Sequence, residues 1–344
     1  MSVLVTGANG FIGSAVVESL LLHGQRDIRC FARRGSDRSR LDALKGRYPD
    51  AGLKIMVGNL ACREDAGRAL DGTETVFHLA AGMRGSTADL FLNTVVTSRN
   101  LLEAAARTKP KRIVLVSSFA VYGVALVQAG HVVTERTPLE PHPERRDPYS
   151  YAKHRQERLF WDYHHSRGLP LVVMRPGVVY GPGGLALSTR VGLRLPGLFL
   201  HLGGRNPLPL SFVDNCAAAI VLAGLSQATD GEVYNVHDDD LPTCAEFLGR
   251  YKREVENVRS VRIPYPLLRV LSVMNEKYTV YARGQMPAVL TPYRTAATWK
   301  RTGFDNHKLK QLGWRPLVST DEGLRHTFQY LRAQLVDSEK AAVR

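Results

Sequence analysis

A tyrosine and a lysine stand four residues apart in the segment Tyr149-Ser-Tyr-Ala-Lys153. On a helix, side chains at this spacing project from the same face. A lysine charge about 4 Å from a phenolate would stabilise it by at most roughly 4 kcal/mol at an effective dielectric constant of about 20. That interaction would lower the pKa of Tyr149 from about 10 toward about 7, where general acid–base catalysis works best. The pair is a catalytic candidate, and the alternative is an ordinary solvated helix surface.

The segment around this pair has the signals of a well-defined helix over residues 149–167. Asp147 is a suitable N-cap, and Pro148 suits the first helical position. Gly168 is a typical residue just beyond a helix C-terminus. These signals place Tyr149 in the first turn of the predicted helix.

A glycine-rich turn follows the first apolar run of the chain and reads Thr6-Gly-Ala-Asn-Gly-Phe-Ile-Gly13. Glycines at this spacing allow a tight turn and close approach of the backbone to a pyrophosphate, while the next helix offers free N–H groups. The turn lies between a predicted strand and a predicted helix, as a dinucleotide site requires. The predicted cofactor-binding residues here are Gly7, Asn9, Gly10, Phe11, Ile12 and Gly13.

The end of the second predicted strand bears on the choice of cofactor. Enzymes that use NAD usually carry an acidic residue there for the ribose hydroxyls. The segment Cys30-Phe-Ala-Arg-Arg-Gly-Ser36 has no acid, and Arg33 could pair with a 2′-phosphate. We therefore expect NADP as the cofactor, with NAD as a possibility. The alternative for Arg33 is a surface arginine in a basic chain.

Short apolar runs alternate with helical patterns through the first half of the chain. This alternation predicts a doubly wound parallel α/β sheet of the Rossmann type, with helices on both faces. The predicted strands cover residues 3–6, 28–32, 54–57, 75–79, 112–117 and 171–174, and the predicted helices cover residues 12–22, 64–70, 90–108 and 149–167.

Beyond Arg175 glycine and proline become frequent, as expected where loops build a substrate-binding part. A strand at 233–236 is predicted to rejoin the sheet, and helices are predicted at 215–225, 244–251, 266–281 and 321–332. The predicted division is a cofactor-binding Rossmann domain at 1–175 with 212–238, a smaller discontinuous substrate-binding part at 176–211 and 239–335, and a polar, frayed tail at 336–344.

Several motifs in order along the chain resemble the extended short-chain dehydrogenase/reductase family. They are TGANGFIG at 6–13, Gly58-Asn59-Leu60, Phe77-His78-Leu79-Ala80-Ala81, Asn93 with Asn100-Leu101-Leu102, Val116-Ser117-Ser118, Pro148-Tyr149-Ser150-Tyr151-Ala152-Lys153, Arg175-Pro176, Phe212-Val213-Asp214-Asn215 and Leu312-Gly313-Trp314. Asn59 stands where the family usually has an aspartate, and its amide oxygen can still accept a hydrogen bond from adenine.

The resemblance implies roles for individual residues. Tyr149 would be the general acid or base, Lys153 would bind the nicotinamide ribose and lower the pKa of Tyr149, and Ser118 would hold the substrate oxygen. For Ser118 alone, a turn hydroxyl is the alternative. Further cofactor contacts implied by the resemblance are Asn59, Leu60, Leu79, Ala80, Ala81, Asn93, Ser117, Pro176 and Val179, in addition to Tyr149 and Lys153.

The substrate class is indicated by what this chain lacks. Sugar-nucleotide enzymes of the family have an asparagine where this chain has Val178, and dehydratases have Asp-Glu where it has Phe119-Ala120. These differences resemble the branch with 3β-hydroxysteroid dehydrogenases and dihydroflavonol reductases. We expect an NADP-dependent reductase or dehydrogenase acting on a ketone or secondary alcohol of a fairly apolar small molecule. A nucleotide-sugar epimerase, dehydratase or reductase is the alternative, and an NADP-sensing regulator is a third hypothesis.

The substrate-side segments leave two interpretations open. The apolar stretches at 192–202 and 263–274 would suit a pocket wall or simple core packing. Arg190, Arg194 and Arg205 lie in the same region and could meet a phosphate, so a phosphorylated or sugar-linked substrate stays open.

The net charge of +14 is the unusual bulk property. The basic residues are scattered without a nucleic-acid recognition pattern, so we expect an anionic cofactor, no nucleic acid, and at most weak membrane-surface association. The four cysteines lack disulfide or metal spacing, and no signal peptide or membrane-spanning run is seen, so we expect a cytoplasmic protein without a metal. The family resemblance suggests a homodimer packed through the helices that contain Leu90 and Tyr149.

Overall fold

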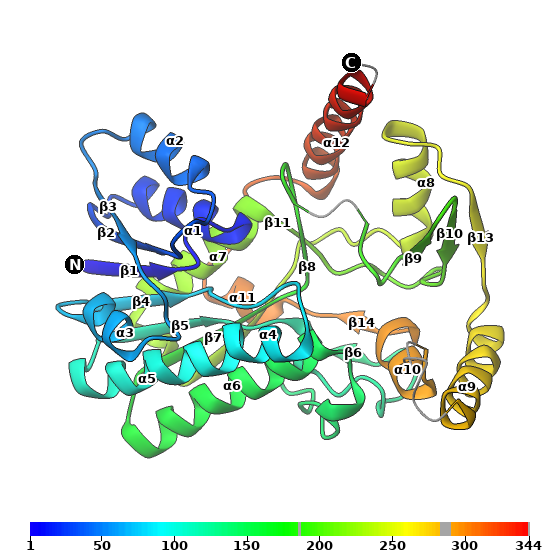
Figure 1. Ribbon diagram of the computed structural model, residues 1–344, viewed down its shortest axis with the longest axis horizontal. Helices are drawn as coiled ribbons and strands as arrows, with labels where there is room; N and C mark the ends of the chain where they lie inside the picture. The colour runs from blue at the N-terminus through cyan, green and yellow to red at the C-terminus, as the bar shows by residue number, and fades with distance from the viewer. Residues whose placement is uncertain (185–186, 283–289, 343–344) are drawn as a thin grey trace.

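The computed structural model describes residues 1–184, 187–282 and 290–342, with side chains through residue 337 (Figure 1). Its centre is a parallel seven-stranded sheet in the order β12-β7-β5-β4-β1-β2-β3. The predicted α/β Rossmann fold is confirmed, and every predicted strand of the sheet is present. The strands are β1 Ser2–Thr6, β2 Asp27–Ala32, β3 Gly52–Val57, β4 Thr75–His78, β5 Arg112–Val116, β7 Leu171–Pro176 and β12 Glu232–Val236.

Helices cover both faces of this sheet. In β1, Val3 and Val5 pack toward one core layer and Leu4 packs toward the other, because successive side chains of a strand alternate. The first layer includes residues of α1 (Phe11–Leu22) and α7 (Val213–Leu225). The second includes residues of α3 (Arg63–Leu70), α5 (Thr97–Thr108) and α6 (Pro148–Arg167).

The helices at 292–299 and 307–311 were not predicted, and two helical regions of the N-terminal half also differ from the sequence prediction. The helix expected over 90–108 begins earlier and has three parts, which are α4 (Thr87–Phe91), the π-helix η1 (Leu92–Val96) and α5. Ser86 caps α4 through a reciprocal pair of hydrogen bonds with Asp89, which explains the earlier start. The helix α2 (Ser39–Arg47) was not predicted, because it is polar and buries only Leu41 and Leu44.

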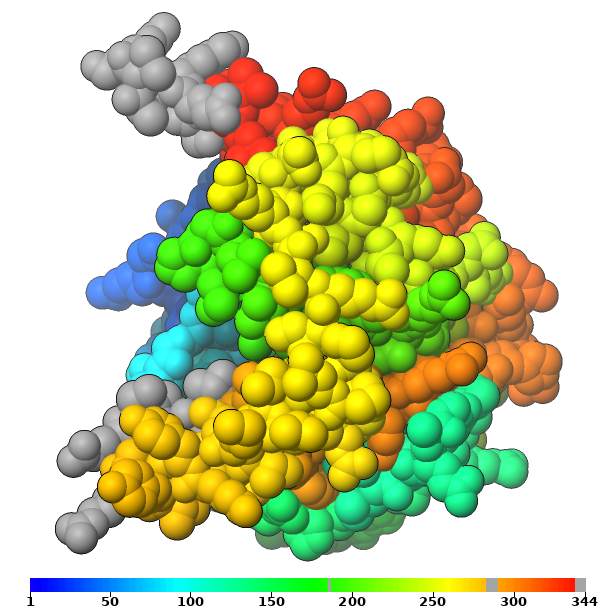
Figure 2. Space-filling model, turned by 90° about the vertical axis from the view of Figure 1, so that its right-hand side faces the viewer, coloured from blue at the N-terminus to red at the C-terminus, as the bar shows by residue number. Residues whose placement is uncertain are grey.

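The C-terminal half builds a second, smaller part beside the carboxyl ends of the strands (Figures 1 and 2). Its strands are β8 Val178–Tyr180, β9 Gly192–Leu195, β10 Leu198–His201, β11 Leu210–Phe212 and β13 Ser260–Arg262. Its helices are α8 Cys244–Glu254, α9 Tyr265–Tyr281 and α10 Pro292–Trp299. Three further short elements lie nearby, namely β6 Val132–Val133, β14 Gly303–Phe304 and α11 His307–Gln311.

The end of the chain corrects one prediction. The helix α12 runs over Thr320–Ala342, so residues 336–342 are helical and not a frayed tail. Glutamate, lysine and alanine residues, which favour helices, continue the helix there. None of the described helices combines the length and hydropathy needed to cross a membrane.

Candidate active site

The glycine turn has the close contacts that a dinucleotide cradle needs. Gly7 has φ +68°, and a Cβ atom on it would lie 3.0 Å from the backbone nitrogen of Ala80. A Cβ atom on Gly13 would lie 2.0 Å from the Gly7 oxygen, so only glycine fits there. The partly exposed residues Leu79, Ala80 and Ala81 therefore lie against the turn at the end of β4. The residues present fit a bound dinucleotide at this edge of the sheet.

The helix α6 starts and ends as predicted. The Asp147 carboxylate accepts a hydrogen bond from the Ser150 backbone N–H at 3.0 Å and from the Ser150 hydroxyl at 2.5 Å. Gly168 ends the helix with left-handed backbone angles. Tyr149 is thereby held in the first turn of α6.

Tyr149 and Ser118 are brought together, although 31 positions separate them in the printed sequence. Burial raises the pKa of Tyr149, and the nearby Asp147 charge raises it further, whereas hydrogen bonding with the Ser118 side chain lowers it. The net direction is upward, so the predicted lowering of this pKa by Lys153 is wrong for the described structure. Ser118 also accepts a hydrogen bond from the Ala120 backbone N–H at 3.2 Å, which fixes its hydroxyl at the end of β5.

Lys153 is buried and held by polar contacts that sequence reasoning missed. Its ammonium donates to the backbone oxygen of Val116 at 2.7 Å and to the side-chain oxygen of Gln156. Burial lowers the pKa of Lys153 to about 7, against the attraction of Glu157. The buried ammonium therefore loses its proton more readily than an exposed lysine does.

The contacts of Lys153 continue as a chain of buried hydrogen bonds to strands β4 and β1. The Gln156 amide donates to Ser98 at 2.8 Å, Ser98 contacts His78 at 2.9 Å, and His78 contacts Thr6 at 2.8 Å. Burial, with a contribution from Lys153, lowers the pKa of His78 to about 3, so its ring is neutral. Gln156 could have been found from its position three residues after Lys153, whereas Ser98 and His78 carry no local signal.

Because of Lys153, the stability of the cofactor-free enzyme should depend on pH. The pKa of its ammonium is about 10.5 in the unfolded chain and about 7 in the folded chain. Between these values the unfolded chain binds the extra proton, so the Lys153 contribution to stability rises with pH. We expect the unfolding free energy of wild type to increase, relative to Lys153→Met, from about pH 7 to about pH 9. Urea unfolding at several pH values measures this difference, and a constant difference would contradict the burial of Lys153.

A buried ion pair joins α6 to β7 next to Ser117. Glu157 and Arg175 form an ion pair with side chains 0% and 4% exposed. Ser117 donates a hydrogen bond to the Glu157 carboxylate at 2.5 Å. The hydroxyl of Ser117, predicted to contact the cofactor, is therefore used inside the protein. The pair joins α6 to the ends of β5 and β7.

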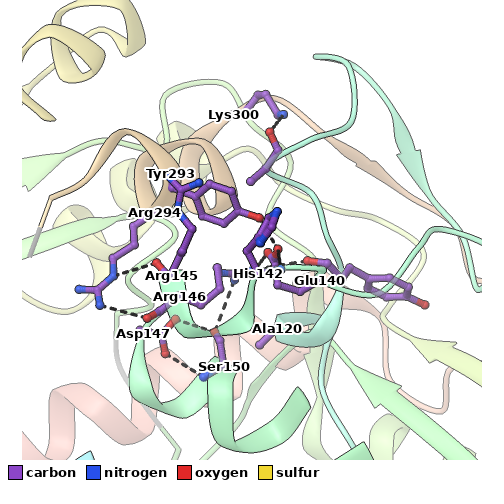
Figure 3. A network of polar contacts seen from close by, with 12 residues as sticks. Ala120, Glu140, His142, Arg145, Arg146, Asp147, Ser150, Tyr293, Arg294 and Lys300 are labelled. Atoms are coloured by element: carbon purple, nitrogen blue, oxygen red, sulfur yellow. Dashed lines mark hydrogen bonds and ion pairs between the residues drawn. The ribbon is translucent and has the colours of Figure 1, made fainter. Parts of the chain in front are cut away.

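A second polar network joins α10 to the start of α6 (Figure 3). Arg146 is buried and pairs with Glu140 at 3.1 Å, and the Tyr293 hydroxyl of α10 donates to the same carboxylate. Arg294 donates to the backbone oxygen of Arg146 at 3.0 Å. The sequence around Arg146 carries no local signal of burial. The structure uses Arg146 to fix the segment that leads into Tyr149.

The predicted nucleotide-end residues lie at the edge of β2, β3 and the π-helix. Arg33 is exposed and donates to the Asn93 side-chain oxygen at 3.3 Å, which places these two predicted cofactor residues together. The Asn59 side-chain oxygen accepts a hydrogen bond from the Ala61 backbone N–H at 3.0 Å, so this oxygen is already bonded within its own loop. Asn100 donates to the Leu60 backbone oxygen at 2.9 Å and holds the same loop.

One further arginine near the glycine turn was missed. Arg40 of α2 donates to the Gly183 backbone oxygen at 3.2 Å, and its guanidinium lies 5.5 Å from the centre of the Phe11 ring. It ties α2 to the loop after β8, across the turn. The basic cluster between Arg33 and Arg40 was the available signal. Of the remaining predicted contacts, Pro176 ends β7 and the partly exposed Val179 lies in β8.

The fold and this site define an NAD(P)-binding oxidoreductase of the extended short-chain type. The model of the NAD-dependent epimerase/dehydratase family matches residues 3–236. The chain belongs to this family and is an enzyme, because its relatives over nearly the full length are reductases, dehydrogenases and epimerases.

Three known proteins illustrate the similarity. A 2-alkyl-3-oxoalkanoate reductase of Shewanella oneidensis is 28% identical, over 93% of this chain and 84% of that protein. A decarboxylating sterol-4-alpha-carboxylate 3-dehydrogenase of Candida albicans is 25% identical, over 97% of this chain and 98% of that protein. The structure of Thermus thermophilus UDP-glucose 4-epimerase with NAD has a TM-score of 0.70 and 24% identity, covering 96% of this chain and 99% of its own. The last similarity shows the shared fold.

Proposed function

We propose that this enzyme transfers hydride between NADP(H) and a ketone or secondary alcohol of a fairly apolar small molecule. The observation that carries the proposal is the hydrogen bonding of Tyr149 with Ser118, one helical turn before the buried Lys153 on α6. The nicotinamide supplies or accepts the hydride when bound. Ser118 and Tyr149 donate hydrogen bonds to the substrate oxygen, and Tyr149 gives or takes its proton. Lys153 binds the nicotinamide ribose.

The raised pKa of Tyr149 fits a role as the proton donor in ketone reduction at neutral pH. Reduction needs a protonated phenol that can give its proton to the developing alkoxide, and burial keeps Tyr149 protonated. Oxidation of an alcohol needs the phenolate, so its rate should increase with pH. The experiment that tests the function is NADPH consumption by the purified enzyme with a panel of ketones and nucleotide sugars.

The proposed preference for NADP is supported by Arg33. No acid follows β2, and the exposed guanidinium of Arg33 lies beside Asn93 at the nucleotide end. We expect Arg33→Asp to lower kcat/KM for NADPH by about 10- to 150-fold, because charged hydrogen bonds to the 2′-phosphate are lost. The value for NADH should not fall. Steady-state kinetics with both cofactors measure this, with the exposed Arg38→Ala as the control. Unchanged discrimination against NADH would exclude Arg33 as the phosphate ligand.

The proposed substrate class is supported by Val178 and by the names of relatives. Val178 is partly exposed and offers no hydrogen bond to a nucleotide-sugar diphosphate. The two relatives described above are named for an oxoalkanoate and for a sterol carboxylate. Both names combine an apolar skeleton and a carboxylate with a carbon that is reduced as a ketone or dehydrogenated.

A nucleotide-sugar epimerase is the second candidate, favoured by a curated relative of Escherichia coli that is named as a 4-epimerase of a glucosaminyl-diphospho lipid. Such an enzyme would keep its cofactor through each cycle. Purified protein with tightly bound NAD that interconverts nucleotide sugars would support it over ketone reduction.

Homodimer formation and weak membrane-surface association stay predictions. Light scattering tests the dimer through α5 and α6. For the membrane, the relevant feature is the outer side of α9, where Leu267, Val270, Met274 and Tyr278 are between 49% and 61% exposed.

A further inference from the structure

Three arginines of the substrate-binding part have different surroundings. Arg194 forms an ion pair with Glu256 at 2.6 Å, and Arg205 is exposed to solvent. Arg190 is partly buried, and its guanidinium has no hydrogen bond or ion pair with any residue that the structure describes. Among the residues that the structure describes, Arg190 is therefore a partly buried cation without a counter-ion.

The neighbours of Arg190 do not neutralise its charge. Its guanidinium carbon lies 5.6 Å from the centre of the Phe304 ring. The nearby charged residue is Arg146, whose own charge is already paired with Glu140 at 3.1 Å. Burial and the Arg146 charge lower the pKa of Arg190 to about 10, so it stays protonated at neutral pH. An anionic ligand would supply the opposite charge that none of the described residues provides.

The backbone around Arg190 is firmly held. The Trp299 indole donates to the Thr189 backbone oxygen at 3.0 Å, and the Cys244 thiol contacts the Arg190 backbone oxygen at 3.6 Å. The Arg190 backbone N–H donates to the Ser188 hydroxyl at 3.2 Å. A residue fixed in this way presents its guanidinium with little loss of chain entropy on binding.

A line of aromatic rings connects Arg190 with the catalytic residues. The Phe304 ring stacks on Phe119 with centres 5.4 Å apart and planes 10° apart. Phe119 follows Ser118 directly in the sequence. The geometry points to a second anchor: Arg190 binds an anionic group, a carboxylate or a phosphate, of the substrate whose oxygen is reduced at Ser118 and Tyr149. This inference rests on the proposed function. It adds that the substrate is an anion bound at two points, its reacting oxygen and its anionic group.

The test compares charged and neutral forms of one substrate. A 2-alkyl-3-hydroxyalkanoate, its methyl ester and a hydroxyalkyl phosphate of similar length are oxidised with NADP⁺ or NAD⁺. The variants are Arg190→Met, which keeps an apolar stem, Arg190→Lys, which keeps the charge, and Arg205→Met as an exposed control. Thermal unfolding verifies that each variant folds, and Arg190→Gln replaces the methionine variant if that one does not.

We expect Arg190→Met to lower kcat/KM for the anionic substrate by about 10- to 150-fold, mainly through KM. The methyl ester should be unaffected, Arg190→Lys should retain part of the activity, and Arg205→Met should match wild type. The better of the carboxylate and phosphate substrates identifies the anion. Equal losses on acid and ester, or no loss on either anion, would overturn the role of Arg190 while leaving ketone reduction intact. Failure of wild type on all three substrates and on the ketone panel would instead refute the proposed function.

Discussion

Replacing Tyr149 with phenylalanine is expected to reduce kcat for ketone reduction by about 10²- to 10⁴-fold. The substitution removes the phenolic hydroxyl but keeps the aromatic ring in the first turn of α6. The alkoxide that develops in the transition state then loses both a hydrogen bond and its proton source. Cofactor binding should be preserved, because the glycine turn and Lys153 are unchanged. Stopped-flow kinetics and cofactor titration measure the two effects separately.

Tyr151→Phe is the matched control for this variant. Tyr151 lies on the same helix, and its ring stacks on Phe91 with centres 6.2 Å apart. We expect it to retain wild-type kcat because it does not face Ser118. Full activity of Tyr149→Phe, or an equal loss in both variants, would contradict the assignment of Tyr149 as the acid.

The largest effect on stability is expected from Glu157→Gln. This change leaves the Arg175 guanidinium buried without its counter-ion, and one of its nitrogens already has no partner. Removing one member of a buried pair typically costs about 3–5 kcal/mol. Urea unfolding at neutral pH should show a loss of that size in the free energy of unfolding.

Two further variants make this stability test specific. Glu256→Gln breaks the exposed pair with Arg194, whose side chains are 39% and 56% exposed, and should cost about 0–1 kcal/mol. Adding Arg175→Met to Glu157→Gln should recover part of the lost stability, because no unpaired charge then stays buried. Similar costs for Glu157→Gln and Glu256→Gln would show that the buried pair has no special weight.

The central sheet was predictable because its signals are local. Runs such as residues 3–6 and 28–32 are apolar, short and separated by helical patterns, and the structure contains strands at both. The start of α6 was equally readable, since Asp147, Pro148 and Gly168 each act on their immediate neighbours. The catalytic residues of the family resemblance are adjacent to these elements.

The electrostatics of the site could not be predicted in the same way. Burial raises the pKa of Tyr149, whereas the spacing of Tyr149 and Lys153 predicted a lower value. Arg146 is paired with Glu140, and Tyr293 of the distant helix α10 donates a hydrogen bond to the same carboxylate. The contacts from Lys153 to His78 join residues 75 positions apart in the printed sequence. Such contacts arise from tertiary packing and leave no local pattern.

The most direct test of hydride transfer uses NADPH deuterated at the transferred position. Enzyme, labelled NADPH and a 2-alkyl-3-oxoalkanoate are mixed for a single turnover, and the products are analysed by mass spectrometry. We predict one equivalent of released NADP⁺ and one deuterium on the new carbinol carbon. Failure of NADPH consumption with every ketone, together with epimerisation of a nucleotide sugar by enzyme-bound NAD, would contradict the proposed reductase.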